Sequence, residues 1–317
     1  MALTLSDAAL DVLTTASPIE KANKTRAYAS QWRAGGITEI GSVTLPNRPA
    51  RPQKPELLEL RDMPKRGKAG SKRAKIALLH ALAHIELNAI DLAWDVMARQ
   101  FPCVRHSGGD AMHRSNIRNP YESLEEAHLT GSPLSERDKS RRGDDDFVLP
   151  KEFCTDWIKV ADDEAKHHLM LEERLNDLGA SYGDLPAHDG LWEASEKTAH
   201  DFAARLAIVP MVLEARGLDV TPNMIKIMKG QGDDKTAEYL QIIHDDEITH
   251  VRAGTVWFEA WCAHHGRDVE EYWQHLVKTY FNGRLKSPFN HPSREDAGMI
   301  RDWYEPLADI DLSDSAA

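Results

Sequence analysis

The chain has 317 residues, enough to bury a sizeable core without disulfides or structural zinc. A formal net charge of -12 argues against a general nucleic-acid or anionic-membrane binder, and three widely separated cysteines provide no disulfide framework. No apolar run approaches the ~20 residues of a membrane span, and the N-terminus lacks a basic segment followed by an apolar core, so we expect a cytoplasmic protein with no membrane partner.

The first 70 residues divide into a helical part and an arm. Residues 1–34 predict one or two short amphipathic helices, and residues 42–70 are rich in proline, which favours extended chain. The arm also concentrates basic side chains that could contact RNA or phosphate, although a solvated arm is the favoured interpretation. These side chains are Arg48, Arg51, Lys54, Arg61, Lys65, Arg66, Lys68, Lys72, Arg73 and Lys75.

Two long helices are predicted on either side of a polar insertion. The first begins after Ser71, a good N-cap, and carries apolar residues at helical spacing to near Gln100. The second begins at Pro150 and ends at Leu178, before a glycine. Between them, the charged, glycine-containing segment at about 105–148 predicts a long surface insertion.

The second half of the chain predicts two more long helices. One spans about 190–216 and is closed by Gly217, after which Thr221 and Pro222 begin a short helix. The other spans about 235–265 and ends at a glycine.

Two short helices near 268–281 and 294–304 complete the prediction, and no β-hairpin signal is present. The fold class is therefore all-α. The predicted organisation is a region of N-terminal helices and basic arm (1–70), a helical bundle (71–266) and a C-terminal helical tail (267–317).

Two six-residue sequences repeat each other inside the second and fourth long helices. Residues 162–167 read DDEAKH and residues 245–250 read DDEITH. Residues three apart share one face of a helix, so the Glu and the His of each motif can bind one ion together. A single E-x-x-H is weak evidence because chance supplies many. Two copies with matching aspartates, each in a bundle-length helix, are much stronger evidence.

A ferritin-like two-metal site also needs one glutamate from each of two further helices. Glu86 and Glu214 stand in apolar stretches of the first and third predicted helices. Glu214 precedes Glu247 by 33 residues, and Glu86 precedes Glu164 by 34 once the insertion is left out, so the two halves match as helix–loop–helix repeats. The sequence thus predicts a ferritin-like four-helix bundle with the metal ligands Glu86, Glu164, His167, Glu214, Glu247 and His250.

The charge of this ligand set predicts its metals. Four ionised carboxylates facing one core would be costly if unpaired, and two divalent cations balance them. Carboxylate and imidazole ligands without thiolate favour two iron ions, then manganese, over zinc. Metal-bound histidines usually donate their second N–H to a carboxylate. Asp163 is therefore predicted to hold His250, and Asp246 to hold His167, across the bundle.

Other residues near the motifs have simpler explanations. His80 and His84 could bind zinc, but no acid completes a zinc signature, so a supporting or core role is favoured. Pro210 is predicted to kink the third helix four residues before Glu214. The remaining candidates are assigned to supporting, surface or core-packing roles, although the aromatic ones could carry electrons: His168, His244, Trp94, Trp157, Trp257 and Tyr239.

The segments HIELNAIDLAWD, DWIKVADDEAKHHLMLEERL and IIHDDEITHVRAGTVWF closely resemble the bacterial ferritin-like family of the domain of unknown function four-fifty-five. The arm RPARPQKP and the tail LKSPFN are also similar, so the resemblance covers nearly the whole chain. It implies a ferritin-like bundle with the six ligands named above. The insertion at about 105–148 departs from the family pattern, in which a short loop follows the first helix. The family has no settled reaction.

Reduced di-iron centres of this kind activate O2. The first hypothesis is therefore an oxidoreductase, a hydroxylase or oxidase acting on a small-molecule or RNA substrate, similar in general design to the ferritin-like tRNA hydroxylases. Peroxide or O2 detoxification is one alternative. Non-enzymatic metal storage or a structural metal bundle is another, and storage is disfavoured because the arm, insertion and tail would obstruct cage packing. An external electron donor and a homodimeric state are left open.

Overall fold

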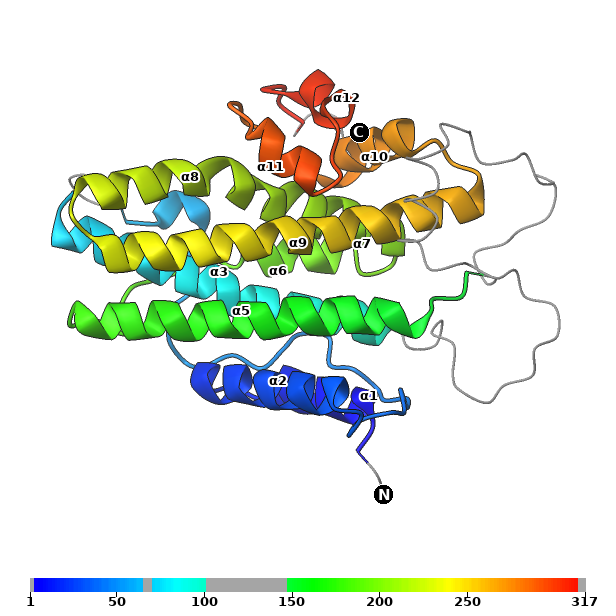
Figure 1. Ribbon diagram of the computed structural model, residues 1–317, viewed down its shortest axis with the longest axis horizontal. Coiled ribbons are helices and arrows are strands. Elements are labelled where there is room, and N and C mark those ends of the chain that lie inside the picture. The colour runs from blue at the N-terminus through cyan, green and yellow to red at the C-terminus, as the bar shows by residue number, and fades with distance from the viewer. Residues whose placement is uncertain (1–2, 65–69, 101–146, 313–317) are drawn as a thin grey trace.

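The computed structural model describes residues 3–64, 70–100 and 147–312 (Figure 1). Within these residues the fold is all-helical and has no strand, although isolated β-bridges join Leu57 to Ala187 and Leu285 to Ala308. The predicted all-α class is confirmed. The predicted insertion at about 105–148 lies almost wholly outside the described residues, and so do the arm residues Lys65, Arg66 and Lys68.

Three long helices carry much of the core: α3 (Lys72–Arg99), α5 (Lys151–Asp177) and α9 (Asp234–His265). α5 lies between α3 and α2 and also contacts α9, and Figure 1 shows α5 and α9 running side by side. Burial of apolar faces, more than intrinsic propensity, stabilises helices packed in this way. The core contains large aromatic side chains that are at most 1% exposed: Trp94, Trp157, Trp257, Phe153 and Phe258.

The ends of these helices follow local sequence signals. Ser71 caps α3 by accepting a hydrogen bond from the Ala74 backbone N–H, as its position predicts. α9 ends at Gly266, which adopts the left-handed conformation with φ 63° that glycine tolerates best. α5 begins at Lys151, directly after Pro150. The predicted bounds of α3, α5 and α9 therefore agree with the structure to within a residue or so.

The prediction of one helix at 190–216 is wrong. The structure has α6 (Gly190–Lys197), a break, and then α7 (Phe202–Ile208) continuing directly into the π-helical segment η4 (Val209–Glu214) and α8 (Ala215–Gly230). The break has a local cause, because the Asp201 side chain accepts a hydrogen bond from the Ala204 N–H and starts a new helix.

Gly217 was predicted to end a helix and Pro222 to begin the next one. Both predictions are wrong, because both residues lie inside α8. Proline has no N–H to donate to the carbonyl four residues earlier, which here is that of Leu218. The Asn290 side chain donates to this carbonyl instead, at 3.1 Å. A donor from the C-terminal part of the chain thus replaces the missing one and allows α8 to continue through the proline.

The N-terminal region forms α1 (Leu5–Thr14) and α2 (Pro18–Arg33), so the prediction of one or two helices within residues 1–34 resolves to two. α2 packs mainly against α5 (Figure 1). α1 packs against α3 and α2. The arm that follows contains the 3-10 turn η1 (Leu60–Asp62) and no longer helix among its described residues.

The C-terminal region lies along α8, α9 and α7 (Figure 1). α10 (Val269–Tyr280) matches the helix predicted at 268–281. The helix predicted at 294–304 is instead two short ones, α11 (His291–Asp296) and α12 (Arg301–Tyr304), followed by the turn η5 (Glu305–Leu307). The division of the chain into three regions stays a prediction.

The arm is fastened to the helical core by buried charges. Lys21 Nζ lies 2.5 Å from Asp91 Oδ1 and 3.2 Å from the Ala50 carbonyl oxygen. Arg51 also contacts the Asp91 carboxylate. Because Lys21 and Asp91 have side chains only 1% and 0% exposed, this network joins α2, the arm and α3 inside the protein.

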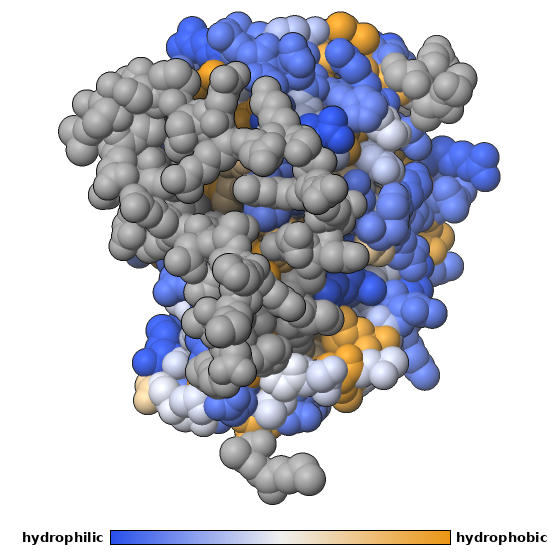
Figure 2. Space-filling view, turned by 90° about the vertical axis from the view of Figure 1, so that its right-hand side faces the viewer, coloured by the Kyte–Doolittle hydropathy of each residue, from blue (hydrophilic) through white to orange (hydrophobic). Residues whose placement is uncertain are grey.

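The helix α3 and one face of the surface bear on the absence of a membrane partner, which stays a prediction. Of the described residues, those of α3 alone form a helix long and apolar enough to cross a membrane, and 67% of its apolar window is buried. This is weak evidence for a span, because the core helix of a soluble protein passes the same test. The face shown in Figure 2 is mainly hydrophilic where it is described, with small separate hydrophobic patches.

Candidate metal centre

A compact group of acids and imidazoles lies where α3, α5 and α9 meet. One ligand atom each from Glu86, Glu164, His167 and Glu247 falls within 4.8 Å of the others, and all four residues are buried. Glu86 comes from α3, Glu164 and His167 from α5, and Glu247 from α9. Glu164 and His167 share one face of α5 because they are three residues apart. This group could hold a metal ion.

Glu164 lies between the two histidines of the repeated motif. Its Oε1 is 2.9 Å from His250 Nδ1, and its Oε2 is 3.7 Å from His167 Nδ1. Glu247 Oε2 lies 3.6 Å from His250 Nδ1, and Glu86 Oε2 lies 3.2 Å from His167 Nδ1. Both imidazoles therefore turn Nδ1 toward the carboxylates, with Glu86 beside one ring and Glu164 between the two.

Glu214 completes the set from the end of η4. It is not one of the four residues of the compact group, but burial and the negative charges of Glu247 and Glu164 raise its pKa, so it lies within electrostatic range of them. Its Oε2 is buried and forms no hydrogen bond. The structure thus brings five of the six residues that the sequence singles out into contact, and Glu214 lies within electrostatic range of them; their role as metal ligands stays a prediction.

The two aspartates of the motifs lie on the outer side of the histidines. Asp246 Oδ2 is 2.9 Å from His167 Nε2, and Asp163 Oδ2 is 3.4 Å from His250 Nε2. Each aspartate thus contacts the histidine of the other motif, in the crossed arrangement that the sequence predicts. Such contacts fix which ring nitrogen carries the proton and leave Nδ1 free to bind a metal.

Burial and mutual charge shift the pKa values of the cluster residues in different directions. Burial and the charge of nearby carboxylates raise the pKa values of Glu86, Glu214 and Glu247. Burial would also raise the pKa of Glu164, but its contacts with His167 and His250 outweigh burial and lower it. Burial lowers the pKa of both histidines, but contacts with carboxylates outweigh it and raise both pKa values. For His167 the carboxylates are those of Asp246, Glu164 and Glu86, and for His250 those of Asp163, Glu164 and Glu247.

Several cluster atoms are buried without any hydrogen bond, which is unusual for charged groups in a folded protein. Two of them, Glu164 Oε1 and His250 Nδ1, lie 2.9 Å apart as an ion pair. A bound cation would satisfy them, and oxygen and imidazole nitrogen are suitable donors. The atoms are Glu164 Oε1 and Oε2, Glu214 Oε2, Glu247 Oε2 and His250 Nδ1. The residues present therefore fit a metal centre.

The helix bearing Glu214 is shaped by Pro210. As the sequence predicts, the regular helix is disturbed there, and Pro210 lies in the π-helical segment η4. Gly254 of α9 faces this segment, and a Cβ added at Gly254 would come within 2.6 Å of Pro210 Cγ and 2.7 Å of Pro210 Cβ. Only glycine allows α9 to approach η4 this closely, so the contact fixes the position of Glu214 relative to α9.

Replacing Gly254 with alanine is expected to destabilise the protein by about 1–3 kcal/mol, because the stiff proline must move. The shift should also weaken the binding of the metal ion that Glu214 is predicted to hold. Denaturant unfolding and metal titration measure the two effects. Gly217→Ala is the matched control inside α8, since nothing lies within 4 Å of its added Cβ. A Gly254→Ala protein that matches the wild type in both measurements would contradict this role.

The other predicted histidines lie outside the cluster. His84 Nδ1 is 2.8 Å from the Tyr182 hydroxyl, and His80 Nε2 accepts a hydrogen bond from the Gly183 N–H. His168 Nδ1 donates to the Ala83 carbonyl at 2.8 Å. His80 and His84 thus fasten the loop between α5 and α6 to α3, whereas His168 joins α5 to α3. The three histidines form no metal-binding group among the described residues.

The remaining predicted residues support packing. His244 lies 3.2 Å from Ser293 Oγ, which ties α9 to α11. Trp94, Trp157 and Trp257 are core residues, and Tyr239 has Lys235 over its ring at 5.5 Å. Sequence reasoning missed Lys159 and Lys166, which contact Asp163 and, for Lys166, also Asp246. Their helical spacing to Asp163 was the available signal.

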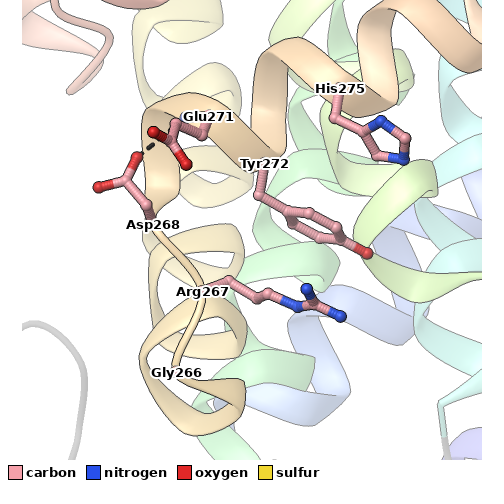
Figure 3. A pocket seen from close by; sticks show the side chains of 6 residues that line it. All are labelled: Gly266, Arg267, Asp268, Glu271, Tyr272 and His275. Atoms are coloured by element: carbon pink, nitrogen blue, oxygen red, sulfur yellow. Dashed lines mark hydrogen bonds between the residues drawn. The ribbon is translucent and has the colours of Figure 1, made fainter.

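A separate pocket of about 610 Å³ lies where α9 passes into α10 (Figure 3). In it the Arg267 guanidinium lies 5.3 Å from the centre of the Tyr272 ring. The pocket begins at Gly266, sixteen residues after His250, which is about 24 Å along the helix axis. The pocket therefore lies apart from the Glu/His cluster.

The fold and the cluster together define an all-helical protein with a buried Glu/His group able to hold a metal ion. The chain belongs to the protein family of unknown function DUF455, whose model matches residues 14–305. An uncharacterized protein of Haemophilus influenzae is 36% identical over 233 residues, which cover 72% of this chain and 67% of that protein. No solved structure matches the chain. The predicted membership of this family of unknown function is confirmed, and its ferritin-like character stays a prediction.

Proposed function

We propose that the chain is a ferritin-like, carboxylate-bridged two-metal protein whose native metal is iron, and that it catalyses an O2-dependent oxidation. The observation that carries this proposal is the convergence of ligand atoms of Glu86, Glu164, His167 and Glu247 within 4.8 Å of one another, with His250 in contact with Glu164 and Glu247. Glu86 with His167 would hold one ion and Glu214 with His250 the other. Glu164 and Glu247 would lie between the ions, because each is close to the ligands of both.

The donor set supports iron. Four carboxylates can balance two divalent cations, and the oxygen and nitrogen donors suit iron and manganese. The described cysteines, Cys154 and Cys262, are buried in the apolar core, where burial raises each thiol pKa to about 12. Bound iron would supply the redox chemistry with O2. The protein would supply the ligands, their orientation and a water-poor surrounding.

The substrate is proposed to be a small organic molecule. RNA is disfavoured because several charges of the basic arm are already paired within the protein. Arg48 contacts Asp189 and Glu196, Arg51 contacts Asp91, and Lys75 contacts Asp233. An external electron donor and a cytoplasmic location complete the proposal.

Anaerobic loading with Fe(II) followed by a pulse of O2 tests this function. We expect two Fe(II) ions per chain and O2 consumption that depends on bound iron. Glu214→Ala should lower the iron stoichiometry while circular dichroism stays unchanged, and unchanged loading would remove Glu214 from the site. Two bound ions without O2 consumption would indicate a structural centre. Consumption of peroxide without an organic substrate would indicate detoxification, and uptake of many ions per chain would indicate storage.

Metal binding is expected to strengthen as the pH rises. The pKa values of Glu86, Glu247 and both histidines are raised in the metal-free protein, so these groups retain protons that an ion must displace. Lowering the pH therefore favours the protonated, metal-free cluster. Calorimetric Mn(II) titrations in two buffers of different ionisation enthalpy should show release of about one proton or more per ion. Heats independent of the buffer would contradict the assignment.

A further inference from the structure

Lys166 lies between the two aspartates that contact the cluster histidines. Its Nζ is 3.1 Å from Asp163 Oδ1 and 2.5 Å from Asp246 Oδ2. Asp163 contacts His250, and Asp246 contacts His167. One ammonium group on α5 is therefore two contacts away from both halves of the metal centre.

The contacts of Lys166 differ from those of the neighbouring Lys159. Lys159 Nζ lies 2.7 Å from Asp163 Oδ2 and 3.0 Å from Thr249 Oγ1, so it reaches one aspartate only. Its side chain is 54% exposed, whereas that of Lys166 is 31% exposed. Two lysines thus balance the charge of two aspartates, but Lys166 alone of this pair joins the aspartates to each other.

We propose that Lys166 is a positioning residue shared by both metal positions, and that it links the binding of the two ions. It holds the Asp163 and Asp246 carboxylates in the orientation in which they accept hydrogen bonds from His250 and His167. This inference rests on the proposed two-metal centre and names a residue that supports both of its ions at once.

The physical reason is the dependence of a metal-bound imidazole on its outer partner. A carboxylate that accepts the Nε2–H fixes the ring orientation and strengthens Nδ1 as a donor. Asp246 Oδ2 is close to both His167 and Lys166, so the ammonium also limits where this carboxylate can turn. Without Lys166, the two aspartates would repel each other, and both rings would lose their fixed partners together.

Calorimetric titration of the full chain with Mn(II) tests the proposal. We expect Lys166→Met to bind two ions but to weaken both binding steps by about tenfold, the lower end of the effect of such outer contacts. Lys159→Met is the matched control and should change at most one step, by a few-fold. Asp246→Asn should weaken mainly the step that involves His167. Lys166→Arg, which keeps the charge and can reach both carboxylates, should restore most of the affinity.

A spectroscopic readout separates positioning from a merely structural role. In the Co(II)-loaded protein, the visible absorption bands of both ions should shift in Lys166→Met and return in Lys166→Arg. If Lys166→Met fails to fold by circular dichroism, Lys166→Gln carries the same test. Two binding constants within twofold of the wild type, or a variant that behaves like Lys159→Met, would overturn the proposal. A wild-type chain that binds fewer than two ions would instead remove the two-metal function.

Discussion

Replacing Glu164 with glutamine is expected to weaken binding of both metal ions by at least about 100-fold, the upper end of effects seen for groups outside the ligand set. Glu164 differs from the other ligands because its two oxygens face different histidines, at 2.9 Å and 3.7 Å. Glutamine keeps the size of the side chain but removes the charge and one of the two acceptor oxygens. Metal content after dialysis and Mn(II) titration measure the loss.

Glu173→Gln is the matched control for this variant. Glu173 lies on the same helix, but its side chain is 59% exposed and pairs with Lys235 at the surface. The Glu173→Gln protein should bind two ions with unchanged affinity, because a surface ion pair of this kind contributes little to stability. A Glu164→Gln protein that still binds two ions tightly would show that Glu164 does not lie between them.

Replacing Asp91 with alanine is expected to destabilise the protein by about 3–5 kcal/mol, because breaking a buried ion pair leaves its partner charged and uncompensated. The partner is Lys21, whose side chain is 1% exposed and whose pKa burial already lowers despite Asp91. Arg51 of the arm would lose its contact as well. Urea unfolding of the metal-free protein measures the change.

The double variant Lys21→Met with Asp91→Leu distinguishes loss of a charge partner from loss of packing. An apolar pair of similar volume often matches or exceeds a buried ion pair in stability. The double variant should therefore be markedly more stable than Asp91→Ala alone. A loss below about 1 kcal/mol in the single variant would mean that water reaches Lys21 and that the arm is not fastened there.

The cluster could be predicted from the sequence because its signals are local. Each E-x-x-H motif places its two side chains on one face of a helix through the helical repeat alone. Glu86 and Glu214 were recognisable as acids within apolar stretches, and the nearly equal spacing of the two halves linked them to the motifs. Helix ends at Ser71 and Gly266 were equally local, since each depends on one capping residue.

The parts that could not be predicted depend on contacts between distant segments. α8 continues through Pro222 because Asn290, far along the chain, donates to the Leu218 carbonyl. The π-helical segment before Glu214 is accommodated by Gly254 on another helix. Lys166 was overlooked because a lysine in a helix is ordinarily a solvated side chain, and only the packing of α9 beside α5 brings Asp246 to it.

Anomalous X-ray diffraction from crystals of the Fe(II)- or Mn(II)-loaded protein tests the central claim most directly. We predict two anomalous peaks about 3.5–4 Å apart, as in other two-metal sites, with Glu164 between them. Glu86 and His167 should bind one ion, and Glu214 and His250 the other. A single peak, no peak, or peaks away from these residues would contradict a two-metal centre.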